Sequence, residues 1–139
     1  MSQATQELSA DAGQLPAATA FLGEFWETAD LPPALVFPFE LALEEIFMNV
    51  VMHGSGGGQV PTVRLIIAAD TDSITLTVAD NGPAFDPLSL ATPDIEADLE
   101  HRRIGGLGVH LVREMMDAVS YAREGGFNQL RMTKNLAPA

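Results

Sequence analysis

Three polar residues interrupt an apolar stretch in the first half of the sequence: Glu45, Asn49 and His53. They are spaced four residues apart, so on a helix they form one line along its surface. Asparagine is a mediocre helix former, and in the middle of an apolar helix it favours a role for its side-chain oxygen. A stripe that simply faces solvent explains the same pattern, so this helix alone leaves both interpretations open.

A second candidate is the stretch DNGPAFDP, residues 80–87. Asp80 is predicted to be the first residue after a strand, and Asn81-Gly82 indicates a turn with positive φ. In this position Asp80 can accept a hydrogen bond from the amino group of a ligand, and Gly82 lets a flat ring approach the backbone closely. A plain loop is the alternative.

The third candidate is IGGLG, residues 104–108. Gly105, Gly106 and Gly108 are predicted to form a loop that opens a helix at Val109. Backbone amides at a helix N-terminus bind phosphate. No GK[ST] follows and no strand directly precedes, so the motif is neither a P-loop nor a dinucleotide fingerprint. A flexible joint explains it as well.

Composition and charge limit the classes of function. The 139 residues suit one domain, 47 % of them are hydrophobic, and the absence of cysteine excludes disulfides and thiolate chemistry. The net charge of −12 argues against nucleic acid as the main partner, because neutralising phosphates requires clustered Lys and Arg. An anionic ligand therefore needs a cation or backbone amides. The acidic surface suits a basic protein partner, or merely solubility.

The apolar runs are too short to span a membrane, and the first residues lack the plan of a signal peptide. We therefore expect a cytoplasmic protein with no membrane contact.

The periodicity of the chain predicts an α+β fold. The expected elements are a short strand within 5–10, helices over 15–29, 37–53 and 108–120, and hairpins from 62–68 with 73–79 and from 119–123 with 127–134. Helices are expected on one face of a mixed or antiparallel sheet, as an α/β sandwich. Residues 1–14 are expected to be an N-terminal segment and residues 15–136 a single domain. The long connection before residue 104 indicates a lid or a disordered segment.

Taken together, the order and spacing of the three stretches resemble the Bergerat-type ATP-binding fold (GHKL) of gyrase, Hsp90, MutL and histidine kinases. The similarity is greatest to the small anti-sigma factor serine/threonine kinases. It is carried by ELALEEIFMNVVMHG, DNGPAFDP, GGLGVHLVREMMDAVSY and LRMTK, and it covers about residues 15–136. The resemblance implies ATP and Mg²⁺ as ligands, a DxG motif for adenine, a glycine-rich box for phosphates and a lid at about 86–104.

The resemblance also implies a role for individual residues. Glu45 is expected to be the catalytic base that accepts the proton of the attacking hydroxyl, and Asn49 the Mg²⁺ ligand. Thr133 is expected to help Asp80 hold adenine through water. The residues implied in ATP binding are Asn49, His53, Asp80, Gly82, Arg102, Arg103, Gly105, Gly106, Leu107, Gly108, Val109, His110 and Thr133. For His53 and His110 a packing role is equally open, and Phe85 is expected in the core or at the hinge of the lid.

The partners that the resemblance implies are an anti-anti-sigma factor of the STAS type, phosphorylated on Ser or Thr, a sigma factor, and a second copy of the chain in a homodimer. The alternative is a nucleotide-gated binding module that switches partners without transferring phosphate. Glu45 favours the kinase, because binding alone requires no base. The acidic residues of the predicted lid keep the alternative open; they are Asp94, Glu96, Asp98 and Glu100.

Overall fold

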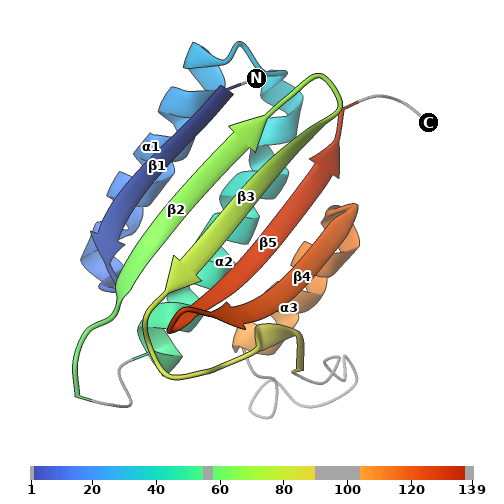
Figure 1. Ribbon diagram of the computed structural model, residues 1–139. Coiled ribbons are helices and arrows are strands. Elements are labelled where there is room, and N and C mark those ends of the chain that lie inside the picture. Colours follow the sequence, from blue (N-terminus) through green and yellow to red (C-terminus); the bar gives the residue numbers. More distant parts are fainter. Residues whose placement is uncertain (1, 55–57, 90–103, 137–139) are drawn as a thin grey trace.

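The computed structural model describes residues 2–54, 58–89 and 104–136, and it packs helices against one face of a twisted sheet (Figure 1). The helices are α1 (Leu15–Thr28), α2 (Val36–His53) and α3 (Ile104–Met115), with short 3₁₀ turns at Ala12–Gln14, Pro33–Leu35 and Pro87–Ser89. The strands are β1 (Ser2–Ser9), β2 (Thr62–Ala69), β3 (Ser73–Asp80), β4 (Ala118–Glu124) and β5 (Phe127–Asn135). The predicted α+β sandwich is confirmed.

The sheet has the order β1-β2-β3-β5-β4, and each neighbouring pair in it is antiparallel. The mixed sheet that the sequence left open is therefore not formed by these strands. The N-terminal strand is longer than predicted, because β1 pairs along the whole of β2, from Ser2 opposite Ala69 to Ser9 opposite Thr62. The side chains of β1 are mostly polar, so the hydrogen bonds of its backbone to β2 account for its length.

The core lies between the helices and the inner face of the sheet. Alternate residues of β2 are fully buried, as the period of two predicts, while the residues between them face away from the helices. Phe39, Leu43 and Phe47 of α2 fill the centre of this layer. The helix α2 packs against both α1 and α3 (Figure 1). The line of Glu45, Asn49 and His53 lies on the side of α2 that faces α3 and the end of β3, because Glu45 meets Gly108 of α3 and the other two residues share a pocket with Asp80.

The β2–β3 hairpin is closed by the side chain of Asp70. Its Oδ1 accepts hydrogen bonds from the backbone N–H groups of Asp72 (2.8 Å) and Ser73 (2.9 Å). The bond from Asp72 and then that from Ser73 lower the pKa of this carboxyl. The predicted hairpin is confirmed, and in its register Asp80, the last residue of β3, lies opposite Val63.

Three predicted boundaries are wrong. Asp80 is the last residue of β3 rather than the first residue after it. The helix α3 begins at Ile104, so the glycines predicted to form a loop lie in its first turns. It ends at Met115, because the backbone N–H of Asp117 already donates to the carbonyl oxygen of Thr133 and β4 begins at the next residue, Ala118. The predicted lid lies mostly in residues 90–103, outside the described residues.

Within the described ranges, no helix combines the length and the apolar character that crossing a bilayer requires.

Candidate functional site

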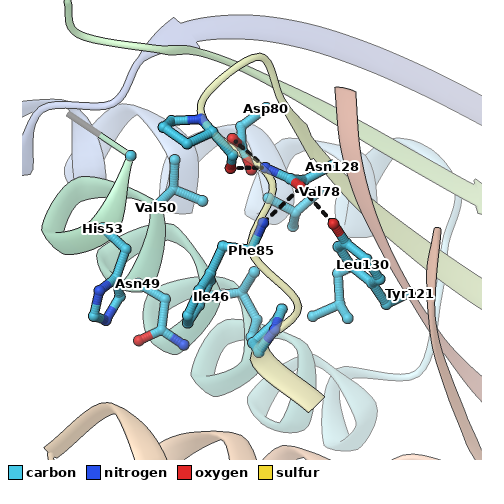
Figure 2. Close-up of a pocket in the computed structure, with 13 residues that line it drawn as sticks. Ile46, Asn49, Val50, His53, Val78, Asp80, Phe85, Tyr121, Asn128 and Leu130 are labelled. Atoms are coloured by element: carbon cyan, nitrogen blue, oxygen red, sulfur yellow. Dashed lines mark hydrogen bonds between the residues drawn. The ribbon is translucent and has the colours of Figure 1, made fainter. Parts of the chain in front are cut away.

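A pocket opens where α2 faces the end of β3 and the β4–β5 hairpin (Figure 2). Its volume is about 390 Å³, including the part open to solvent. Ile46, Val78 and Leu130 form apolar walls, while Asn49 and Asp80 bring polar groups to it. A mainly apolar hollow with a few polar groups is the usual form of a small-molecule site.

Asn49 is the buried member of the polar line on α2. Its side chain is 3 % exposed, and its Nδ2 has no hydrogen-bond partner among the residues that the structure describes. A buried amide without a partner costs about 1–3 kcal/mol, so native proteins rarely keep one without a use for it. Because a carboxamide can rotate, the unpaired end can present either a donor or an oxygen to a ligand. This observation fits a ligand or a metal ion at Asn49.

Asp80 presents a carboxylate at the opposite wall of the pocket. Its Oδ1 accepts hydrogen bonds from the backbone N–H of Gly82 (2.9 Å) and from Nδ2 of Asn128 (3.0 Å). No residue in the described part of the chain donates to its Oδ2. The carboxylate is thus held by one oxygen, and the other can accept a hydrogen bond from a ligand.

The expected partnership between Asp80 and Thr133 is wrong. In the β3–β5 register Asp80 lies opposite Asn128, whereas Thr133 lies opposite Thr75, five residues further along β5. At about 3.4 Å per residue this separates Thr133 from Asp80 by about 17 Å. Thr133 instead shares a hydrogen bond with the hydroxyl of Thr75 at 3.0 Å. The residue that contacts Asp80 from β5 is Asn128.

Asn128 and Tyr121 were missed in the sequence, although both line the pocket. The available signal was that asparagine is depleted in strands, so an Asn within a predicted strand is a candidate for a special role. Tyr121 reads as an ordinary aromatic strand residue, and nothing in the sequence distinguishes it.

Gly82 is needed for close packing rather than for an unusual backbone angle. The positive φ expected at this turn is wrong, since among the described glycines positive φ occurs at Gly58, Gly125 and Gly126. A Cβ at Gly82 would lie 3.0 Å from Asp80 Oδ1 and 3.1 Å from the carbonyl oxygen of Gly54. The end of α2 and the turn after β3 therefore meet backbone to backbone.

Glu45 lies one turn before Asn49 on α2, and its carboxylate packs directly against the backbone of α3. A Cβ placed on Gly108 would come within 1.9 Å of Glu45 Oε2. Burial raises the pKa of this half-buried carboxyl, and the negative charge of Glu44 raises it further. The structure thus brings Glu45 to the glycine-rich first turns of α3, with a pKa shifted towards that of a useful base.

Gly108→Ala is expected to reduce any reaction that depends on Glu45 by at least about tenfold, because its methyl group would displace the carboxylate. The matched control is Gly23→Ala in α1, where a Cβ meets no atom within 4 Å. That variant is expected to gain about 0.5–1 kcal/mol of stability with unchanged turnover. Turnover and denaturant unfolding measured on both variants test the expectation, and full activity of Gly108→Ala would contradict it.

The two histidines differ in their surroundings. The ring of His53 stacks on that of Phe85, with ring centroids 4.6 Å apart and an angle of 22° between the planes (Figure 2). Both line the pocket, so Phe85 belongs to the pocket wall rather than to the core. His110 lies on α3 with its Nε2 3.7 Å from Glu114 Oε1.

The remaining predicted residues belong to α3 or precede it. Val109 is buried in the core, which leaves only its backbone for a ligand. Gly105, Gly106 and Leu107 lie in the first turns of the helix. Arg102 and Arg103 lie outside the described residues.

Comparison with known proteins agrees with this geometry. The family model of the histidine kinase-like ATPase domain matches residues 8–134. Among curated proteins, the serine/threonine-protein kinase BtrW of Bordetella bronchiseptica is 34 % identical over 104 residues, covering 75 % of this chain and 73 % of BtrW. The serine-protein kinase RsbW of Listeria monocytogenes is 30 % identical over 99 residues, covering 68 % of this chain and 62 % of RsbW.

Among solved structures, the RsbU and RsbW domains of Rv1364c from Mycobacterium tuberculosis are similar over the whole chain, with a TM-score of 0.66 and 15 % identity. The match covers 34 % of that protein, and identity at this level shows the fold alone.

Proposed function

The chain belongs to the histidine kinase-like ATPase family, and from that premise we propose that it is an ATP-dependent serine/threonine kinase of the anti-sigma factor type. The named relatives BtrW and RsbW are serine/threonine- and serine-protein kinases. The observation that carries the proposal for this chain is the placement of Glu45 against the first turns of α3, one turn from the unpaired amide of Asn49. A binding module needs no such carboxylate.

The pocket is the proposed ATP site. Oδ2 of Asp80 is available to accept a hydrogen bond from the amino group of adenine. The N-terminus of α3 supplies a positive dipole end and backbone amides for phosphates, which suits an acidic protein that must bind an anion. Arg102 and Arg103 remain predicted phosphate contacts.

Asn49 is the proposed Mg²⁺ ligand, through its carboxamide oxygen. Magnesium prefers oxygen ligands and is usually bound by one or two protein groups together with substrate phosphates. A bound Mg²⁺ would offset phosphate charge during transfer. The neutral amide adds no further negative charge to the site.

Glu45 is the proposed general base. It would accept the proton of a serine or threonine hydroxyl on the partner protein while that oxygen bonds to the γ-phosphorus. The bond from the γ-phosphorus to its bridging oxygen then breaks, and ADP leaves. Phosphoryl transfer depends mainly on positioning and charge stabilisation, and the base adds a smaller share.

The proposed protein partners are an anti-anti-sigma factor of the STAS type as phosphate acceptor and a sigma factor as the regulated protein. A homodimer in the cytoplasm is the proposed state of the chain. The fold and the acidic surface are compatible with these partners, and the relatives' kinase activity supports the first of them.

Incubation with Mg-[γ-³²P]ATP and a STAS-type protein from the same genome is expected to place label on a partner serine or threonine. A partner with that residue replaced by alanine is the control and should stay unlabelled. Saturable ATP binding without label on any partner would contradict kinase activity and support the nucleotide-gated binding module instead.

A further inference from the structure

We propose that Asn128 is a positioning residue that fixes Asp80 for recognition of an amino group on the nucleotide base, and that Tyr121 supports it. This inference rests on the proposed ATP site and extends it to base selectivity. It assigns a role to two residues that the family-based interpretation did not include.

All four hydrogen-bonding positions of the Asn128 carboxamide are occupied. Its Nδ2 donates to Asp80 Oδ1 (3.0 Å) and to the carbonyl oxygen of Pro83 (2.8 Å). Its Oδ1 accepts from the backbone N–H of Phe85 (3.1 Å) and from the Tyr121 hydroxyl (2.5 Å). Figure 2 shows this residue between the Asp80 turn and Tyr121.

The orientation of this amide is determined by its neighbours. The Pro83 carbonyl can only accept, and the Phe85 N–H can only donate, so a flipped carboxamide would face two like groups. With the amide fixed, the Tyr121 hydroxyl must donate its proton to Oδ1. Asn128 is buried at 6 % exposure, and at that depth a mismatched group is costly.

The consequence for Asp80 is that its two carboxylate oxygens have different roles. Oδ1 is occupied by two donors, Gly82 N–H and Asn128 Nδ2. Oδ2 is left as an acceptor for the ligand. A purine with an amino group at position 6 offers a donor to it, whereas a 6-oxo purine offers a carbonyl oxygen that the carboxylate repels. Asn128 therefore contributes to selectivity through Asp80 without needing to touch the base.

The same strand pair holds the turn from a second side. Arg123 lies opposite Asn128 in the β4–β5 register, and its Nη1 donates to the carbonyl oxygen of Gly82 at 2.7 Å. Side chains of the β4–β5 hairpin thus hold the turn from Asp80 to Pro83 by its backbone carbonyl oxygens and by the Asp80 carboxylate. A turn held at several points changes its position little when ligand is absent.

The test compares Asn128→Ala with Gln129→Ala, titrating each protein with Mg-ATP and with Mg-ITP, the 6-oxo analogue. Gln129 is the matched control because it is the next residue of β5, and in a strand successive side chains point to opposite faces. Asn128→Ala is expected to lower the preference for ATP over ITP by about tenfold or more, since a hydrogen bond to a charged group is lost. Gln129→Ala is expected to keep the wild-type preference.

The ratio of the two affinities distinguishes a positioning role from a merely structural one. If Asn128 only stabilised the fold, its loss would weaken the binding of ATP and of ITP by the same factor. An unchanged ratio in folded Asn128→Ala would overturn the inference. Should that variant not fold, Tyr121→Phe decides: it removes one hydroxyl and is expected to reduce the ratio by a smaller factor while lowering the melting temperature by only a few degrees. An unchanged ratio in Tyr121→Phe would then overturn the inference. Failure of the wild-type protein to bind Mg-ATP would instead contradict the proposed function.

Discussion

Glu45→Gln is expected to lower the rate of phosphate transfer to the partner protein by about 10²–10⁴-fold, the usual contribution of a general base. Glutamine keeps the shape of the side chain beside Gly108 but cannot accept the hydroxyl proton. Mg-ATP binding should change little, because the pocket walls and Asp80 are untouched. Single-turnover transfer and ATP titration on the same preparation measure the two effects separately. Wild-type transfer by this variant would show that the base is misassigned.

The raised pKa of Glu45 adds a pH dependence with a definite sign. Its protonated form cannot act as a base, so the transfer rate should fall as the pH is lowered through the raised pKa. Glu44 is an exposed neighbour whose negative charge contributes to the increase, so Glu44→Gln should lower the pKa of Glu45. The acidic limb of the rate profile should then move to lower pH. A shift in the opposite direction would contradict this origin of the pKa.

Asn49→Leu is expected to abolish Mg-dependent ATP binding while making the ligand-free protein more stable. The variant removes the proposed metal ligand and also the buried Nδ2 that has no partner in the described residues. Replacing an unsatisfied buried amide with an apolar group of similar size recovers about 1–3 kcal/mol. Titration calorimetry with and without EDTA, together with denaturant unfolding, gives both readouts.

The control for this prediction is Asn135→Leu, the same substitution at an exposed residue. Asn135 is the last residue of β5, at the end of the strand away from Asn128 and the pocket. It should change neither ATP binding nor stability appreciably. Intact Mg-dependent binding by Asn49→Leu would remove Asn49 from the metal site. A loss of stability would show that the amide has a partner in the folded protein, and would weaken the argument from its burial.

Much of the fold could be predicted because the chain is strongly periodic. The alternation in β2 and β3, and the helical spacing in α1 and α2, determine which faces are buried, and the family expected from the motifs is confirmed. The boundaries of α3 could not be predicted well. Consecutive glycines usually indicate a loop, yet the backbone is helical from Ile104.

The candidate site was predictable where the residues are close in sequence and less so where strands meet. Asp80 and Gly82 follow from one short motif. Thr133 matches a family threonine in sequence, but a sequence match does not determine the register of a strand. Pairing with β3 brings Asn128 to Asp80 instead. The close approach of Glu45 to Gly108 depends on how α2 packs on α3, which local patterns do not encode.

The backbone contact between Gly54 and Gly82 has a consequence for the dynamics of the pocket. Neither glycine has a side chain that could move to make room, and Pro61 lies against both. A shift of the end of α2 therefore requires a shift of the turn at Gly82. The end of α2 and the turn from Asp80 to Pro83 should therefore open as one cooperative unit. Their amide hydrogens, monitored by exchange with deuterium, should share one opening free energy.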